Sequence, residues 1–320
     1  MSASGGTRAI IAAFLANTGI ALTKFIAWFF SGSASMLAEG VHSVADAGNQ
    51  LLLILGGRQA KKAADKEHPF GYGRERYVYA FVVSIILFSV GGIFSIYEGI
   101  DKLQHPHELE VPWLPILVLS IAIVLESFSL RTAVKESNHV RGRQSWVQFV
   151  RHAKAPELPV VLLEDIAALL GLVFAFFGVG LTIITGNSLF DAIGTLMIGT
   201  LLIIVAIILG METKSLLVGE GANDEDLQKI ERAILAGPEA ERIIHMKTLY
   251  LGPDELLVAA KIGFHADQRL LEVATATNVI EERIRQAVPT ARVIYLEPDV
   301  YVDPKAAAPA TDAIVIKGLE

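Results

Sequence analysis

Long apolar stretches fill most of the first two thirds of the chain, and they constrain its fold more than any other feature. A helix that crosses the hydrocarbon core of a bilayer needs about 20 mostly apolar residues. Six segments between residues 9 and 214 have this character: Ile10–Phe30, Ala34–Leu55, Tyr77–Tyr97, Trp113–Ala133, Pro159–Thr185 and Leu189–Leu209. The sequence therefore predicts an all-α membrane domain of six transmembrane helices over residues 1–214.

The first two of these segments carry polar residues at membrane depth. Ile10–Phe30 contains Lys24, and its apolar stretch exceeds the roughly 7–15 residues of a signal-peptide core, although small residues at 31–35 resemble a cleavage site. Ala34–Leu55 is less apolar, and a hydropathy window alone can pass over it. Its polar members are Glu39, His42, Asp46, Asn49 and Gln50.

Basic residues in the loops predict the orientation. The loop after the second segment contains Arg58, Lys61, Lys62, Lys66, Arg74 and Arg76, and the loop after the fourth contains Lys135, Arg141, Arg143, Arg151 and Lys154. The other loops have few positive charges, and basic loops stay in the cytoplasm. We therefore expect an integral membrane protein with both termini cytoplasmic, and the bacterial plasma (inner) membrane as its location.

The sequence after Glu212 has the mixed polar and apolar pattern of a soluble α/β unit, which we assign to residues 215–303. The pattern predicts a helix, two strands, a second helix and a third strand, the order α-β-β-α-β of a two-layer α+β domain. The predicted elements are Asn223–Leu235 with Asp224 as N-cap, Arg242–Leu251, Glu255–Phe264, Asp267–Ala287 and Arg292–Leu296. The Ala/Pro-rich tail 304–320 is predicted to be disordered, although Ala313–Ile316 has the composition of a short strand.

Composition and missing motifs exclude several classes of function. The chain has no cysteine, which removes thiolate metal sites. Its net charge of −7 and pI near 5.7 argue against a nucleic-acid partner. Neither a Walker A loop nor an H-E-x-x-H sequence occurs, which argues against an ATP-driven pump and a metalloprotease. We expect no enzymatic activity and no bound cofactor.

Ionisable residues in the second and fifth segments are the candidate ligands. His42 and Asp46 are four residues apart, so they share a helical face, and Glu39 lies near it. Glu164 and Asp165 are adjacent and point about 100° apart. Nitrogen and oxygen ligands suit zinc, manganese, iron(II) or cobalt. Two other interpretations stay open: a structural His–Asp pair, with Asp46 or Glu39 neutralising Lys24, and a proton relay without metal.

Two local sequences resemble the cation diffusion facilitator family. They are S-M-L-A-E-G-V-H-S-V-A-D over residues 35–46 and H-P-F-G-Y-G-R-E-R over residues 68–76, where Arg76 replaces the usual final Glu. The resemblance implies a homodimer that exchanges a divalent cation for protons and has a ferredoxin-like cytoplasmic dimerisation domain. The run L-L-E-D over residues 162–165 is similar to a divergent branch that includes mitochondrial zinc transporters of animals.

The family's transport site has two ligands on the second span and two on the fifth. Carried over by position, these are His42, Asp46 and Asp165, but Val161 occupies the fourth position, and Glu164 is our candidate replacement. Glu39 is a further candidate.

A second family site, in the loop after the second span, matches Asp65 and His68, but Tyr72 stands where His often occurs. The last strand of the C-terminal domain lacks the expected His, and His245 and His265 do not form a convincing site. The predicted function is efflux of a divalent metal ion, zinc first, in exchange for protons. Manganese, iron(II) or cobalt export, a passive cation channel and a non-transporting receptor are the alternatives.

Overall fold

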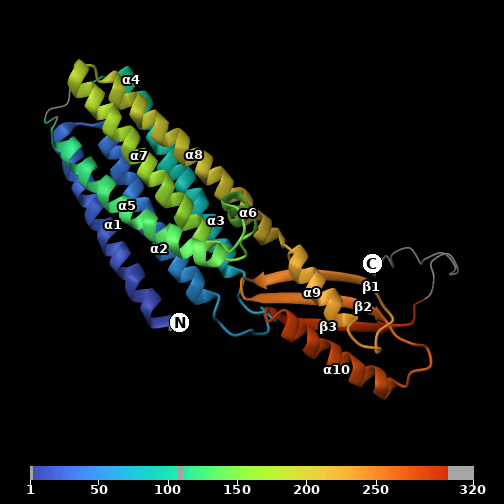
Figure 1. The fold of residues 1–320 in the computed structure, drawn as a ribbon. Helices are drawn as coiled ribbons and strands as arrows, with labels where there is room; N and C mark the ends of the chain where they lie inside the picture. The colour runs from blue at the N-terminus through green and yellow to red at the C-terminus, as the bar shows by residue number, and fades with distance from the viewer. Residues whose placement is uncertain (1–2, 107–110, 112, 302–320) are drawn as a thin grey trace, which may run out of the picture. The chain divides into compact units, whose positions relative to one another are not determined.

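The chain divides into two compact units between Gly219 and Glu220. The computed structural model describes residues 3–106, 111 and 113–301 (Figure 1). The predicted disordered tail 304–320 and its short strand lie outside the described residues. The two units are described separately below.

The first unit is built from long helices that lie side by side as a bundle (Figure 1). Its elements are α1 (Ala3–Ser31), α2 (Ala34–Gln59), α3 (Glu75–Ile86), the π-helix η1 (Leu87–Ile93), α4 (Phe94–Gln104), α5 (Trp113–Arg141), the short α6 (Trp146–His152), α7 (Glu157–Thr185) and α8 (Leu189–Val218). Elements α3, η1 and α4 form one continuous helical segment.

Four helical segments are long and apolar enough to cross a membrane, among the residues that the structure describes. They are Glu75–Gln104, Trp113–Arg141, Glu157–Thr185 and Leu189–Val218. Each contains one of the last four predicted spans and extends beyond it. Helix α2 is not among the four, in agreement with the expectation that its polar residues lower its hydropathy below that of the other spans. The structure therefore shows a helical membrane domain.

Glycines allow α7 and α8 to approach each other closely. A methyl group on Gly178 would lie 2.9 Å from the Phe190 carbonyl oxygen, and one on Gly194 would lie 3.0 Å from the Phe174 carbonyl oxygen. Small residues at such crossings bring helix backbones together in membranes, where van der Waals packing drives association. This contact fixes the helix that carries Glu164 and Asp165 against α8.

A buried carboxylate on α8 satisfies the first amides of α2. Asp191 Oδ2 accepts a hydrogen bond from the Ala34 amide at 2.9 Å, and Oδ1 accepts from Ser33 Oγ at 3.0 Å and the Ser35 amide at 3.3 Å. The first amides of a helix have no partner within the helix, and a negative charge there is favourable. Asp191 therefore fixes where α2 begins relative to α8.

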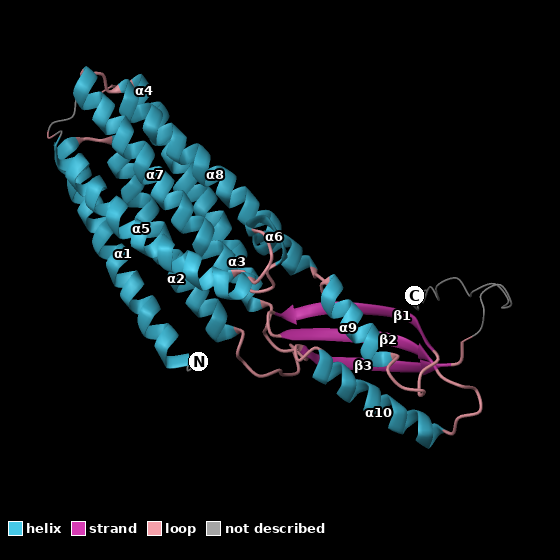
Figure 2. Ribbon diagram, in the orientation of Figure 1, coloured by secondary structure: helices cyan, strands magenta, loops and turns pink. Residues whose placement is uncertain are grey.

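The second unit contains α9 (Asp224–Ile234), β1 (Arg242–Gly252), β2 (Glu255–Gly263), α10 (Leu270–Ala287) and β3 (Ala291–Asp299), in the predicted order (Figure 2). The predicted cap is wrong by one residue: Asn223 is the N-cap of α9, because its side-chain oxygen accepts the Asp226 amide at 2.8 Å. Helix α10 starts three residues later than predicted.

The three strands form one sheet in the order β1-β2-β3, with β1 and β2 antiparallel and β2 and β3 parallel. Alternate residues of β2 (Leu256, Val258, Ala260 and Ile262) are buried, as the two-residue period of a strand requires. They share one apolar core with Ile230 of α9 and Ile280 of α10, so both helices cover the same face of the sheet. Pro298 lies in β3, an edge strand, where a missing amide donor is tolerated.

Candidate metal site in the membrane unit

One face of α2 carries a row of polar side chains. Glu39, His42, Asp46 and Asn49 follow one another at intervals of three or four residues, which places them on one side of the helix. Glu39, His42 and Asn49 are at most 1 % exposed, and the Asp46 side chain is 16 % exposed. This is the face on which the sequence analysis placed its candidate ligands.

Several buried polar atoms of this row, and one of the neighbouring Gln50, have no hydrogen-bond partner among the described residues. They are Glu39 Oε1, His42 Nδ1 and Nε2, Asp46 Oδ1, Asn49 Oδ1 and Gln50 Oε1. Buried polar atoms are nearly always hydrogen-bonded, since leaving one unsatisfied costs about 1–3 kcal/mol. A row of unsatisfied lone pairs from one helix is therefore a set of donor atoms available to a cation or to water.

His42 and Asp46 lie together at the middle of the row. His42 Nδ1 is 3.4 Å from Asp46 Oδ1, an ion-pair distance at which the atoms are not aligned as a hydrogen bond. His42 Nδ1 also lies 3.9 Å from the position that a methyl group on Gly91 would take. Gly91 belongs to η1, and π-helical turns are frequent at functional sites. The structure thus brings these two predicted ligands together beside an irregular helical turn.

The acidic pair of α7 divides between two neighbours. Glu164 Oε1 accepts a hydrogen bond from Asn49 Nδ2 of α2 at 2.7 Å, whereas Asp165 Oδ2 accepts one from Ser129 Oγ of α5 at 3.0 Å. Both carboxylates are buried. Glu164 therefore faces the polar row of α2, and Asp165 faces α5.

The interpretation in which Glu39 neutralises Lys24 is confirmed. Lys24 Nζ donates to Glu39 Oε2 at 2.8 Å and to Ser43 Oγ at 2.7 Å, with both charged side chains buried. The second oxygen, Glu39 Oε1, lies 2.7 Å from the position of a methyl group on Gly171 of α7. One oxygen of Glu39 is thus committed to Lys24, and the other points toward α7.

Val161 lies away from the polar row, in an apolar cluster with Ala133 of α5, Phe149 of α6 and Leu162. No group of three or more His, Asp or Glu side chains is preformed for a metal ion among the described residues. The predicted ligands are therefore adjacent in pairs, His42 with Asp46 and Glu164 beside Asn49, and do not form one closed shell.

Glu126 and Ser129 of α5 lie near the Asp165 carboxylate but were not predicted from the sequence. The Asp46 carboxylate is within electrostatic reach of Glu126, Glu164 and Asp165, and Glu126 is within reach of Asp165. Glu126 is the single acidic residue in the predicted span Trp113–Ala133. A charged side chain inside a membrane costs free energy and often marks a functional position, so its presence could have identified Glu126.

In the loop after α2, the predicted metal ligands contact other residues of the same loop. Tyr72 donates its hydroxyl to Asp65 Oδ2 at 2.6 Å, and His68 Nδ1 lies 3.7 Å from Asp65 Oδ1. The hydrogen bond from Tyr72, followed by those from the His68 and Glu67 amides, lowers the pKa of Asp65 from its usual value. Tyr72 thus occupies an oxygen of Asp65 that a metal would need.

In the described part of the second unit, neither His245 nor His265 belongs to a group of three or more metal-binding side chains. His265 pairs with Glu241, and His245 lies on β1 opposite Lys261 of β2. Lys261 forms ion pairs with Glu297 and Asp299 of β3, both at 3.0 Å, so these two carboxylates are engaged by a lysine.

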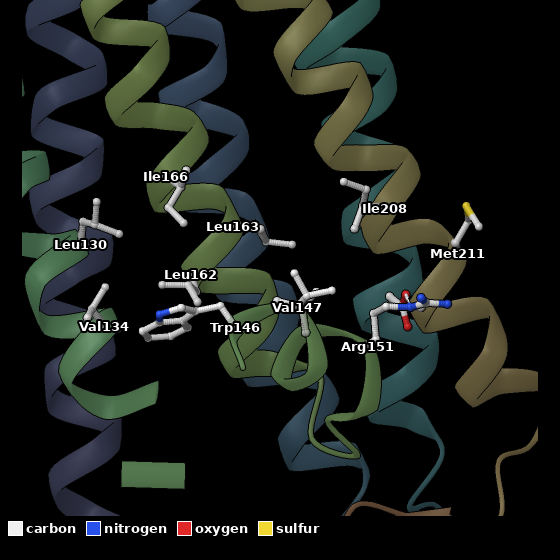
Figure 3. Close-up of a pocket in the computed structure, with 12 residues that line it drawn as sticks. Leu130, Val134, Trp146, Val147, Arg151, Leu162, Leu163, Ile166, Ile208 and Met211 are labelled. Carbon is white, nitrogen blue, oxygen red and sulfur yellow. Dashed lines mark ion pairs between the residues drawn. The ribbon is translucent and has the colours of Figure 1, made fainter. Parts of the chain in front are cut away.

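A cavity of about 750 Å³ between α5, α6, α7 and α8 is a poor candidate for the site. Figure 3 shows its apolar side chains, with Trp146 and Arg151 on α6. Its acidic member, Glu212, forms an ion pair with Arg151 at 3.7 Å. Its lining is otherwise apolar, and its one carboxylate is engaged by arginine, so this cavity is not the metal site.

Comparisons with known proteins cover most of the chain. Residues 10–218 match the cation efflux transmembrane domain. The chain is 34% identical over 267 residues to "Proton-coupled zinc antiporter SLC30A9, mitochondrial" of Xenopus laevis, which covers 82% of this chain and 48% of that protein.

Two further relatives have different names. Metal tolerance protein C4 of Arabidopsis thaliana is 29% identical over 81% of this chain and 57% of its own length. The cation-efflux pump FieF of Klebsiella pneumoniae is 25% identical over 95% of this chain and 94% of its own. The chain spans about half the length of the SLC30A9 relatives that it matches. The match over most of the helical unit and the identity to these relatives show that this integral membrane protein belongs to the cation efflux (CDF) family of transporters.

Proposed function

We propose that the protein moves a divalent metal cation, zinc in the first place, out of the cytoplasm in exchange for protons. The observation that carries this proposal is the row of buried, unsatisfied donor atoms on α2, led by His42 and Asp46, with Glu164 of α7 facing the row. His42, Asp46 and Asp165 are the proposed ligands, and Glu164 reaches the same region through Asn49. The names of the SLC30A9 relatives support proton coupling and zinc.

Protons are coupled to the metal through these ligands. An imidazole and carboxylates must lose their protons before they coordinate a cation, so metal binding releases protons and protonation favours metal release. A site of this composition exchanges the two substrates without a separate proton channel. We expect the apparent metal affinity to rise with pH, and an affinity that stays flat across the pH range in which the protein is folded contradicts proton coupling at this site.

The proposal includes the finer architecture. Helices α1 and α2 complete six spans, both termini face the cytoplasm, and the membrane is a bacterial plasma membrane. The unit with the order α-β-β-α-β has a ferredoxin-like fold and dimerises, with domain limits near residues 1–214 and 215–303. The basic loops between α2 and α3 and around α6 support this orientation. The loop residues Asp65 and His68 are not part of the transport site, because Tyr72 engages Asp65.

The test is transport by the purified protein in vesicles that contain a metal-sensitive dye and carry an imposed pH gradient. Asp46→Ala and Asp165→Ala should abolish zinc movement. Glu136→Ala, an exposed carboxylate at the far end of α5, should leave it unchanged. Wild-type rates from both ligand variants contradict the site. Flux that ignores the pH gradient and does not saturate indicates a passive channel instead.

Manganese, iron(II) and cobalt are the alternative substrates, favoured by the excess of oxygen over nitrogen donors around His42. Transport of the four metals at matched free concentrations decides between them. Zinc transport that is slower than manganese or iron(II) transport contradicts the assignment to zinc.

A further inference from the structure

A cavity of about 620 Å³ lies between α1, α2 and α5 in the membrane unit, and part of its wall is polar. Its polar lining residues are Asn17, Thr23, Gln50, Glu126 and Ser129. Glu126 is the acidic member of this lining. A carboxylate in a span must be paired, hydrated or bound to a cation, since burying it alone costs several kcal/mol.

This cavity shares its wall with the candidate metal site. Ser129 lines the cavity and donates to Asp165 at 3.0 Å. Gln50 lines it too, and lies four residues from Asp46 on the same face of α2. The side-chain oxygen Gln50 Oε1 is buried and has no hydrogen-bond partner among the described residues.

The contacts between α5 and α7 place Glu126 at the level of the site. Ala133 packs in one cluster with Leu162, and Ser129 contacts Asp165. These two contacts show that α5 and α7 run antiparallel. Glu126 is three residues before Ser129 and shares its face of α5. Val161, by contrast, lies in the apolar cluster at the level of Ala133.

Acidic residues outnumber basic ones in this region. The Asp46 carboxylate interacts electrostatically with Glu126, Glu164 and Asp165, and Glu126 interacts with Asp165. Lys24 acts on Asp46 and Glu126 too, but it forms its ion pair with Glu39. Carboxylates that gather in an apolar surrounding repel one another unless they take up protons or a cation joins them, and these are the two states that a metal–proton exchanger needs. The cavity lies beside this group and has room for water molecules.

We propose that Glu126 is a further ligand of the transported cation and supplies the carboxylate that α7 lacks at Val161. The cation would then be held by α2, α5 and α7 together, with Ser129 positioning Asp165. A set of one imidazole and several carboxylates suits a divalent metal with nitrogen and oxygen preference. This inference rests on the proposed function and adds α5 to the site.

The experiment measures equilibrium zinc binding to the full chain in lipid nanodiscs, alongside vesicle transport and melting temperature. Glu126→Gln keeps the size of the side chain and removes its charge, and should weaken zinc binding at least about tenfold without lowering the melting temperature. Glu126→Asp keeps a shorter carboxylate and should bind more tightly than Glu126→Gln. Glu136→Gln, on the same helix and exposed, should bind and transport like the parent.

The results separate the two proposals. Wild-type zinc affinity and transport in Glu126→Gln, together with loss of both in Asp46→Ala, overturn the role of Glu126 and leave the proposed function standing. Equal loss of binding in Glu126→Gln and Glu126→Asp, with a lower melting temperature in both, identifies a structural role and also overturns it. No zinc binding or transport by the parent protein refutes the proposed function itself.

Discussion

Lys24 Nζ lies 2.8 Å from Glu39 Oε2 and 2.7 Å from Ser43 Oγ, so a buried lysine of α1 is held against the helix that carries His42 and Asp46. Both partners of this ion pair are at most 4% exposed. A pair at this depth joins the two helices, and its positive charge lies near the proposed cation site. Removing one partner leaves the other charge buried without compensation.

The first prediction follows from that pair. Lys24→Met should lower the free energy of unfolding by roughly 3–5 kcal/mol, and the double variant Lys24→Met/Glu39→Gln should recover most of the loss, because neither charge is then left alone. Thermal unfolding followed by tryptophan fluorescence measures both. Retention of zinc binding by the double variant supports a structural role for Glu39, and loss of binding in a stable double variant assigns Glu39 to the ligands.

The second prediction concerns the start of α2. Asp191→Ala removes acceptors from Ser33 Oγ and the amides of Ala34 and Ser35, and should lower the unfolding free energy by about 3 kcal/mol. Asp191→Asn keeps one acceptor oxygen and should lose less. Thr200→Ala is the control, since Thr200 is exposed on α8 and bonds to its own helix. Equal melting temperatures for the two alanine variants contradict the role of Asp191.

Much of the architecture could be predicted from the sequence because hydropathy and charge act locally. The last four predicted spans lie inside helices, and the order of the C-terminal elements is correct. Boundaries were harder to predict. Helix α5, for example, continues into polar sequence beyond the stretch that is apolar enough to cross a membrane. At the start of α9, only the hydrogen bond from the Asp226 amide identifies Asn223, and not Asp224, as the N-cap.

The candidate site was predictable only in part, because spacing along one helix says nothing about which helix lies opposite. His42 and Asp46 could be placed on one face from their spacing alone. The separation of Glu164 toward Asn49 and Asp165 toward Ser129 depends on packing between helices. Glu126 was missed for the same reason: its neighbours, Asp165 and Gln50, are distant in the sequence.

The third prediction concerns pH and the second unit. Arg283 donates two hydrogen bonds to Glu239, at 3.0 and 2.7 Å, and this pairing lowers the pKa of the Glu239 carboxyl below its usual value. The stabilisation is therefore fully present above the pKa of the unfolded chain, near 4.3, and is lost as pH falls through the lower folded value.

Hydrogen exchange of α10 as a function of pH tests this prediction. The parent should lose protection of α10 in acid, and Glu239→Gln should show less protection at neutral pH and a shallower dependence on pH. Glu231→Gln, exposed on α9, should follow the parent. Identical pH profiles for parent and Glu239→Gln contradict a contribution from this ion pair.

The fourth prediction compares two glycines on α7 that have different surroundings. A methyl group on Gly178 would lie 2.9 Å from the Phe190 carbonyl oxygen, a backbone atom that moves only if α8 moves. The nearest atom to a methyl group on Gly180 is Ile116 Cδ1, at 4.0 Å. Gly178→Ala should therefore destabilise the membrane unit by about 1–3 kcal/mol through overpacking, whereas Gly180→Ala should be neutral or stabilise it by up to about 1 kcal/mol, as an alanine in a helix does.

The Gly178 contact also bears on the site, because α7 carries Glu164 and Asp165. An α7 displaced from α8 changes the distance from these carboxylates to the polar row of α2. Zinc affinity should therefore fall in Gly178→Ala and stay at the parent value in Gly180→Ala, measured by equilibrium binding below both melting temperatures. Unchanged affinity in a destabilised Gly178→Ala would show that the glycine crossing supports the fold without setting the geometry of the ligands.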